Sequence, residues 1–362
     1  MNRQERYTEL LLQMLSVPAL SREEHQRADF LENYFRNAGI PVRRIHNNLI
    51  AGEPDEDGSR RTILLNSHID TVPPTGDWTT DPFKPVIEGN KITALGSNDA
   101  GASVVALIWT FEDLREKVQD RLRLLLVLSA EEEVSGSNGI ASLVGQLKGV
   151  DGAIIGEPTS MQPAVAERGL MVIDAEVHGR PGHTARNEGD NAIYKALKDI
   201  MAIRQIQFPG KSEWLPDPSI QVTMIESGMK HNIVPDLCKY VIDVRSNDCY
   251  SNQQLLELLR ETCGATLHPR SLHLGASILP VNHCFHQAIR LSGLEPFGSL
   301  TLSDMALLPF PAVKMGPGHS SRSHTADEYI YIGEIEKGVM VYTRFINSVY
   351  TILKHKTNET MG

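Results

Sequence analysis

The chain has 362 residues, of which 41% are hydrophobic and 22% are charged, an ordinary composition for a globular protein. This length exceeds the size at which a single hydrophobic core usually stops growing, so two domains are expected. The formal net charge of −10 and the scattered lysines and arginines argue against nucleic acid and anionic membranes as partners.

The beginning of the chain predicts a helix rather than a targeting segment. Tyr7, Leu10, Leu11 and Met14 recur at helical spacing, and polar residues interrupt any apolar run of the signal-peptide type. No stretch approaches the roughly 20 apolar residues that span a bilayer. The cysteines form no CxxC pair, and we expect reduced thiols in a cytoplasmic protein. They are Cys238, Cys249, Cys263 and Cys284.

Helix and strand patterns alternate through the first half of the chain. Helices are predicted over 5–15 and 23–38, and the second ends at Gly39 with Pro41 beyond it. Because continuous apolar strands alternate with helices, the pattern predicts an α/β sheet covered on both faces. The strands are expected at 62–68, 91–95, 121–129 and 151–157, with a further helix over 101–118.

The pattern changes after Arg168 to alternating strands that predict an α+β region. Helix–strand alternation resumes near Pro280 and ends in a helix over 332–351. We therefore predict a discontinuous catalytic domain, residues 1–169 and 273–362, with a second domain inserted at 170–272. The α+β region has expected strands at 169–179, 219–228 and 239–245 and helices at 191–203 and 251–263; the last part has a helix at 283–293 and a strand at 312–316.

Three adjacent acids, Glu131, Glu132 and Glu133, follow the apolar run LRLLLVLSA. Neighbouring carboxylates repel one another, and burying any of them without a partner is costly. For an isolated triplet, a solvated loop or the first turn of a helix is the more common explanation. The other polar stretches of this chain favour a functional explanation instead.

Further candidate ligands lie mostly just past predicted strands, where open α/β sheets build their sites. His68 ends a strand in LLNSHIDTVPP, and Asp70 is placed to accept its other ring N–H. Asp99 lies in the turn LGSNDAGAS before a helix, where a helix cap is the alternative. Glu157 follows a strand in IIGEPTS, and His324 lies in GPGHSSRSHTADE. Histidine and carboxylate ligands without thiolate suit Zn²⁺ or Co²⁺ in a hydrolytic site.

The order of these motifs resembles a known family. HxDxVP is followed by Trp78, by Pro82 and Phe83, and then by Asp, EE, EPT, GRPGHTA and SHxxDE motifs, from about residue 5 to 355. The series is similar to that of the acetylornithine deacetylase, succinyl-diaminopimelate desuccinylase and aminoacylase family of di-metal amidohydrolases. The resemblance implies an α/β, zinc-exopeptidase-like catalytic domain with a mixed sheet flanked by helices. It also implies that the inserted α+β domain serves for dimerisation or as a lid.

The same resemblance implies two divalent metal ions, Zn²⁺ or Co²⁺, that share one carboxylate. Asp99 would be the shared ligand and Glu132 the general base, while Glu131 stands where the family usually has Asp. The peptide bond between Asp99 and Ala100 would be cis, and His319 falls outside the matched pattern. The remaining ligands would be His68 and Glu157 on one ion, and Glu133 and His324 on the other.

The inserted domain carries further residues that match the family. In that family the histidine of GRPGHTA reaches the active site of the partner subunit and stabilises the oxyanion; here it is His183, so the resemblance implies a homodimer. Arg168 and Arg245 match substrate-binding arginines, which would hold a carboxylate, with a structural ion pair as the alternative. Asn232 and Ser303 also match positions near the substrate.

The leading interpretation is metal-dependent hydrolysis of the amide bond of an N-acyl amino acid. Within the family, the compact length of the chain and its GPG…SHTADE ending look most like acetylornithine deacetylase of arginine biosynthesis. Acetyl or succinyl derivatives of ornithine, citrulline or diaminopimelate are the candidate substrates. A dipeptidase or aminopeptidase of the same family is the enzymatic alternative. A non-catalytic metal-binding relative is the other, although the base and every proposed ligand are present.

Overall fold

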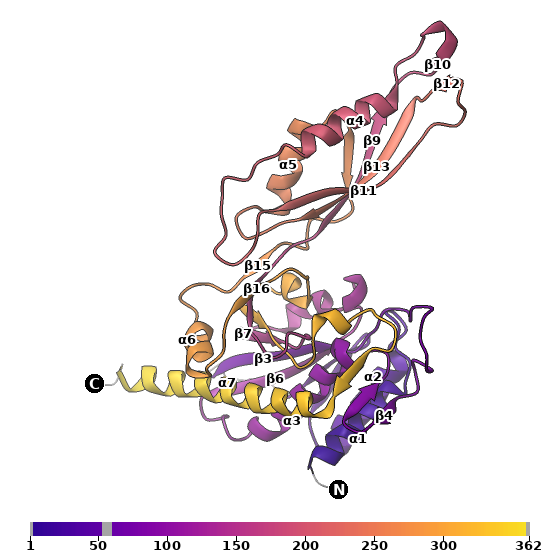
Figure 1. Cartoon of the computed structure of the whole chain (residues 1–362). Helices are drawn as coiled ribbons and strands as arrows, with labels where there is room; N and C mark the ends of the chain where they lie inside the picture. Colours follow the sequence, from indigo (N-terminus) through magenta and orange to yellow (C-terminus); the bar gives the residue numbers. More distant parts are fainter. Residues whose placement is uncertain (1–2, 53–59, 360–362) are drawn as a thin grey trace. The chain divides into compact units, whose positions relative to one another are not determined.

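The computed structural model describes residues 3–52 and 60–359, with side chains as far as 354 (Figure 1). Two compact units make up the chain: unit 1 comprises residues 1–165, 279–297 and 303–362, and unit 2 comprises 166–278 and 298–302. The segment 170–272, predicted as an inserted domain, falls within unit 2. Its role in dimerisation or as a lid stays a prediction.

The main sheet of unit 1 is mixed, as predicted. Its strand order is β1-β2-β6-β3-β7-β17-β8-β15, with β16 paired to β8; β8 and β16 cross the boundary between the units, and β15 belongs to unit 2. The central strands β6, β3, β7 and β17 are parallel, and the outer pairs are antiparallel. The strands are β1 (Val42–Ile45), β2 (Asn48–Ala51), β3 (Arg61–His68), β6 (Leu122–Ser129), β7 (Val150–Ile155), β8 (Ala164–Glu167), β15 (Ser277–Ile278), β16 (Phe297–Ser299) and β17 (Ala312–Lys314).

Helices cover one face of this sheet. The long helix α7 runs beside α3, which packs on β3 and β6 (Figure 1). Because α3 lies between the sheet and other helices, nearly all of its sequence ASVVALIWTFEDL is buried, as expected for a helix that is apolar all round. The helices of unit 1 are α1 (Arg3–Leu15), α2 (His25–Asn37), α3 (Ala102–Leu114), α6 (Cys284–Leu291) and α7 (Ile332–Glu359).

Short helical segments and a small sheet complete unit 1. Ile140, Leu143 and Met305 from two of these segments pack with strand residues such as Leu64 and Val127 on the other face of the main sheet. The segments are η1 (Ser97–Gly101), η2 (Glu132–Val134), η3 (Ile140–Gln146), η5 (Asp304–Leu307) and η6 (Ser320–Arg322), and the small sheet has the order β18 (Tyr329–Tyr331), β5 (Lys91–Thr93), β4 (Val86–Glu88).

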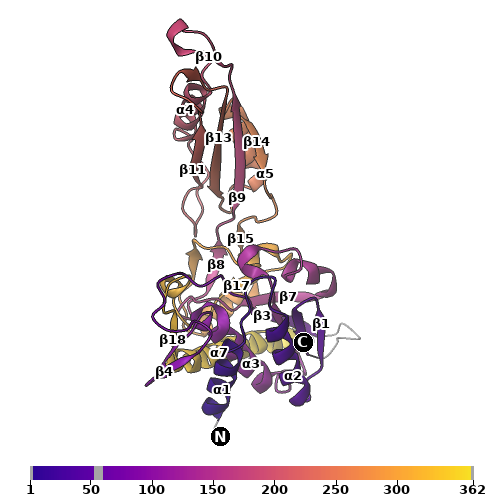
Figure 2. The same cartoon turned by 90° about the vertical axis from the view of Figure 1, so that its right-hand side faces the viewer.

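Unit 2 is built on a four-stranded antiparallel sheet with the order β11-β13-β9-β14 (Figure 2). Alternate residues of β9 are buried, which is the pattern of a sheet with one covered face. Buried residues of α4 and α5, such as Ala196 and Leu256, join the same apolar core as Tyr240. The elements are β9 (Met171–His178), β11 (Ser219–Ser227), β13 (Leu237–Arg245), β14 (Thr266–Pro269), α4 (Ala192–Ile203), α5 (Asn252–Thr262), η4 (Thr184–Arg186) and the hairpin strands β10 (Gly182–His183) and β12 (Ile233–Val234).

All the long helices and strands expected from periodicity are present, with ends that differ by a few residues. The final helix continues to Glu359 rather than ending at residue 351, and α3 ends at Leu114 rather than at residue 118. Within residues 3–52 and 60–359, none of the helices combines the length and apolarity needed to cross a bilayer.

Candidate metal centre

Three neighbouring parallel strands bring their carboxyl ends to one edge of the unit 1 sheet. His68 is the last residue of β3, which lies between β6 and β7. The acidic triplet follows β6, and Glu157 comes two residues after β7. Because adjacent parallel strands end side by side, these segments of the sequence meet at one place. The predicted ligands therefore share one edge of the sheet.

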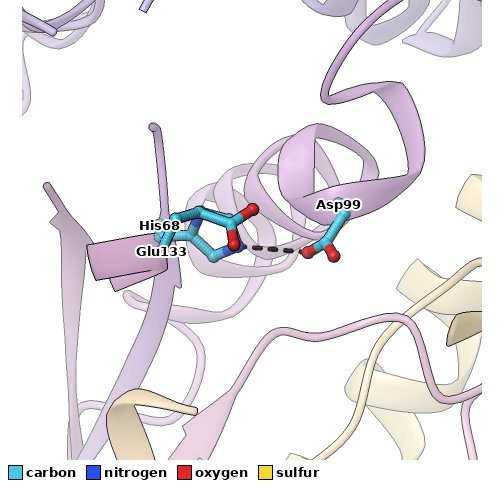
Figure 3. A group of neighbouring side chains, drawn as sticks. All are labelled: His68, Asp99 and Glu133. Atoms are coloured by element: carbon cyan, nitrogen blue, oxygen red, sulfur yellow. Dashed lines mark hydrogen bonds and ion pairs between the residues drawn. The ribbon is translucent and has the colours of Figure 1, made fainter. Parts of the chain in front are cut away.

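Asp99 faces two histidines from the turn that precedes α3. Its Oδ1 lies 3.2 Å from Nε2 of His68, and its Oδ2 lies 3.9 Å from Nε2 of His324. The peptide bond from Asp99 to Ala100 is cis, as the resemblance implied. Figure 3 shows the Asp99 carboxylate directed at the His68 ring, beside Glu133. A carboxylate with its two oxygens turned to different histidines suits a ligand shared by two ions.

The other two acids divide between these histidines. Oε1 of Glu157 lies 3.6 Å from Nε2 of His68, and Oε2 of Glu133 lies 2.9 Å from Nε2 of His324. The candidate ligand atoms of His68, Asp99 and Glu133 all lie within 4.8 Å of one another. The structure thus brings together the five residues predicted as ligands, in two groups that share Asp99.

Asp70 orients His68 and connects it to the triplet. Nδ1 of His68 lies 3.0 Å from the backbone carbonyl of Asp70 and 3.5 Å from its carboxylate, so the other ring nitrogen faces the acids. The Asp70 carboxylate accepts the hydroxyl of Ser21 at 2.7 Å and the backbone N–H groups of Glu132 and Glu133 at 3.1 and 3.2 Å. Such a carboxylate behind a histidine fixes the ring orientation of a metal ligand.

The three acids of the triplet have three different environments. Glu131, which is buried and has a φ of 56°, accepts two hydrogen bonds from Asn138. Glu133 meets His324. Burial raises the pKa of Glu132 well above its ordinary value, and the carboxylates of nearby acids add to the increase although His68 opposes it. Glu131 therefore stabilises the turn, Glu133 is a candidate ligand, and Glu132 is a candidate base.

The charge and chemistry of the site fit divalent cations. Although burial opposes its charged form, hydrogen bonds to Asp70 and Asp99 raise the pKa of His68 well above its usual range. The hydrogen bond to Glu133 raises the pKa of His324 to about 9. Both shifts report the strong negative potential of clustered carboxylates, which also attracts metal cations. Imidazole and carboxylate donors without a thiolate suit Zn²⁺ or Co²⁺.

Comparison with known proteins agrees with this geometry. The family model described as Peptidase family M20/M25/M40 matches residues 64–348. The chain belongs to this family. Succinyl-diaminopimelate desuccinylase of Wolbachia pipientis is 25% identical over 86% of this chain and 83% of its own length. Acetylornithine deacetylase of Klebsiella pneumoniae is 27% identical over 86% of this chain and 88% of its own length.

Solved structures support the same fold. Aminopeptidase PepT of Bacillus cereus superposes with a TM-score of 0.78 at 20% identity, covering 96% of this chain and 99% of that one. A dinuclear metal-binding M20 peptidase of Bacillus subtilis superposes with a TM-score of 0.73 at 14% identity, covering 97% and 98%. This chain is therefore an M20-family hydrolase with the M20 peptidase fold and a candidate metal-binding site.

Sequence reasoning missed two residues that support the site of this M20 chain. The carboxylate of Glu328 accepts the backbone N–H groups of Gly96, Asn98 and Asp99 at 2.9, 2.7 and 2.8 Å. The Asn98 side chain binds the backbone of His319. Glu328 closes the SHxxDE motif of the sequence, and that position was the only signal that could have identified it.

In unit 2, the structure places His183 and Asn232 together. His183 lies in the short β10–β12 ladder opposite Ile233, and the N–H of Thr184 donates to the carbonyl of Asn232 at 3.3 Å. His183 is exposed, and its Nδ1 accepts the N–H of Ala185. Its contribution to an oxyanion site stays a prediction.

The two candidate arginines also lie together in unit 2. Arg245 binds the carboxylate of Asp243 through two nitrogens, at 2.8 and 3.0 Å. Arg168 donates to the backbone carbonyls of Asp217 and Arg245. In unit 1, the hydroxyl of the buried Ser303 accepts the N–H of Met305. Substrate binding by these residues stays a prediction, and the Asp243 pair corresponds to the ion-pair alternative for Arg245.

Proposed function

We propose that this protein hydrolyses the amide bond of an N-acyl amino acid with the help of two divalent metal ions. One observation carries the proposal: the two oxygens of Asp99 face different histidines, and each histidine has its own second carboxylate. That arrangement provides two ligand groups with one shared acid. Glu132, which is not needed as a ligand in either group, lies beside them.

The side chains present would hold Zn²⁺ or Co²⁺. Such ions, when bound, lower the pKa of water and polarise the substrate carbonyl. One ligand group consists of His68, Asp99 and Glu157, and the other of Asp99, Glu133 and His324.

Glu132 is suited to move the proton that hydrolysis requires. Burial favours its neutral form, so its carboxylate is a stronger base than an exposed glutamate. In the reaction, Glu132 takes a proton from water as the oxygen adds to the amide carbon. It then delivers this proton to the amine nitrogen as the carbon–nitrogen bond breaks, leaving a carboxylate and a free amino acid.

We propose N-acetylornithine as a substrate, which would give the protein a place in arginine biosynthesis. The curated relatives include both acetylornithine deacetylases and succinyl-diaminopimelate desuccinylases at similar identity, so a succinyl substrate has equal support. Arg168 and Arg245 are the proposed binders of a substrate carboxylate, with Asn232 and Ser303 as further contacts. Activity as a dipeptidase or as an aminopeptidase, with a peptide as substrate, is the alternative within the same family.

We also propose that the chain acts as a homodimer through one surface of unit 2. The outward side of α4 exposes Ile193, Tyr194, Leu197 and Met201, and β11 is an edge strand of its sheet that exposes Ile225. An edge strand presents unpaired backbone groups, and a second copy can pair with it in the antiparallel direction. In such a dimer, His183 would serve the active site of the partner subunit.

The decisive experiment is a substrate panel with metal-loaded protein. The panel contains N-acetyl and N-succinyl derivatives of ornithine, citrulline and diaminopimelate, together with several dipeptides. We expect chelator-sensitive release of one free amino acid from an N-acyl substrate. Preference for dipeptides would instead support the peptidase alternative. No turnover by protein that binds two metal ions would support the non-catalytic relative.

A further inference from the structure

Glu328 is hydrogen-bonded to the turn that contains Asp99. Only 2% of Glu328 is exposed, and its carboxylate accepts one hydrogen bond from each of three backbone N–H groups of this turn, those of Gly96, Asn98 and Asp99. Its backbone carbonyl accepts two more hydrogen bonds, from the N–H of Ala94 at 3.1 Å and the hydroxyl of Ser97 at 3.3 Å. One residue therefore holds residues 94–99, here called the aspartate turn, along their whole length.

A second connection joins the aspartate turn to residues 319–328, here called the histidine loop. The side-chain amide of Asn98 donates to the carbonyl of His319 at 3.1 Å and to the hydroxyl of Ser323 at 3.3 Å. Its oxygen accepts the N–H of His319 at 3.0 Å. His324 stands between these contacts and Glu328, so the loop is attached to the aspartate turn on both sides of the histidine.

We propose that Glu328 is a positioning residue that sets the spacing between Asp99 and His324. The inference rests on the two-metal function proposed above. It identifies Glu328 as the residue that positions the ligand group containing His324. His68 is the last residue of β3 and Glu157 comes two residues after β7, and these two strands are paired in the main sheet. His324 lies instead on a loop, and its side chain is 55% exposed. The group of Asp99, Glu133 and His324 should therefore depend on Glu328 more strongly than the group that contains His68.

The test is the binding of Co²⁺ to metal-free Glu328→Ala protein, followed by calorimetry and by the visible absorption of the bound ion. Alanine removes the acceptor of three N–H groups. We expect affinity for one of the two ions to fall by about 10–100-fold, the usual effect of losing a residue that supports ligands. The other ion, which shares Asp99 but is also held by the strand-borne His68 and Glu157, should lose clearly less affinity. Asp327→Ala is the matched control, since its carboxylate binds Thr79 rather than the aspartate turn.

Glu328→Gln should recover most of the lost affinity. A single oxygen, Oε1, accepts from both Asn98 and Asp99, and a glutamine oxygen can replace it. Recovery by glutamine would not be expected if the charge alone mattered. Asn98→Ala gives a second route to the test if Glu328→Ala does not fold, because it loosens the histidine loop without removing the carboxylate. The same selective loss is expected.

The possible failures are distinguishable. Wild-type protein that binds two ions, with both affinities unchanged in Glu328→Ala or Asn98→Ala, would overturn the positioning role and leave the proposed function standing. Equal weakening of both ions would also overturn it, since that result indicates general destabilisation. Wild-type protein that binds fewer than two ions would overturn the two-metal proposal and the inference that rests on it.

Discussion

At the scale of single residues, the three acids of the triplet lie in three different environments, and each environment suits a different role. Glu131 is buried and hydrogen-bonded to Asn138, and Glu133 is paired with His324. Glu132, which is only partly exposed, has a raised pKa because desolvation and the neighbouring acids disfavour its charged form. Each side chain has a different set of partners, although the charge of Glu133 still contributes to the raised pKa of Glu132.

Replacing Glu132 with Gln should separate chemistry from metal binding. Glutamine has nearly the same shape but accepts no proton, so we expect kcat to fall by about 10²–10⁴-fold, the usual contribution of a general base. Metal content, measured by elemental analysis, should stay at the wild-type value. Turnover near the wild-type rate would exclude Glu132 as the base.

Glu131→Gln is the matched control one position earlier. Each Glu131 oxygen accepts one hydrogen bond from Asn138, and the amide group of glutamine can replace only one of them. We expect unfolding in urea to report a loss of about 1–3 kcal/mol, because a buried donor loses its partner. The kcat of the folded protein should stay near the wild-type value.

The candidate ligands could be predicted from the sequence, whereas their support could not. His68 and Glu157 are polar residues at the ends of apolar strands, a pattern that is visible locally. The hydrogen bonds of Glu328 to the aspartate turn instead join positions 230 residues apart and end on backbone N–H groups. Backbone donors are present at almost every position, so no residue type in the turn indicates its distant acceptor.

At the scale of elements, the long strands and helices could be predicted because their periodicity extends over many residues. Most strands of two to four residues could not be predicted, although the three-residue strands β5 and β17 lie within the strands expected at 91–95 and 312–316. The ladder that holds His183 has two residues in each strand, β10 and β12, and a two-residue strand has no period. Its position depends on the neighbouring chain segment rather than on local preference.

The end of β17 leaves no space beside Glu157. A Cβ atom added at Gly316 would lie 2.5 Å from the carbonyl oxygen of Glu157 and 2.9 Å from its backbone nitrogen. The carbonyl of Gly316 also accepts N–H groups from Thr159 and Met161, so the two segments cannot simply separate. The glycine is needed for close packing at the point where a candidate ligand leaves the sheet.

Gly316→Ala should therefore disturb the metal centre through the backbone. We expect a destabilisation of about 1–3 kcal/mol, as for overpacking of a core, with weaker metal binding in calorimetry because Glu157 is displaced. Gly145→Ala is the control, since a Cβ at that position meets no atom within 4 Å. Unchanged stability and metal affinity in Gly316→Ala would show that the segments adjust without cost.

At the scale of the whole molecule, the surface of α4 predicts the assembly. Leu197 is 53% exposed and Tyr194 is 72% exposed, although the opposite side of this helix is packed in the core of unit 2. Leu197→Glu should place charge in the interface and convert a dimer of twice 40.1 kDa into a monomer of 40.1 kDa in light scattering. Val281→Glu, at an 81% exposed position of unit 1, is the control and should stay dimeric. A wild-type monomer would contradict the assembly itself.

If His183 acts on the partner subunit, two inactive variants should complement each other. His183→Ala keeps an intact base, and Glu132→Gln keeps an intact histidine. A dimer with one subunit of each kind has one site in which Glu132 of the first subunit meets His183 of the second. Random mixing of equal amounts makes half of the dimers mixed, with one working site of two, so the mixture should recover roughly one quarter of wild-type activity. Activity no higher than the mean of the separate variants, despite subunit exchange seen by mass spectrometry, would place His183 outside the shared site.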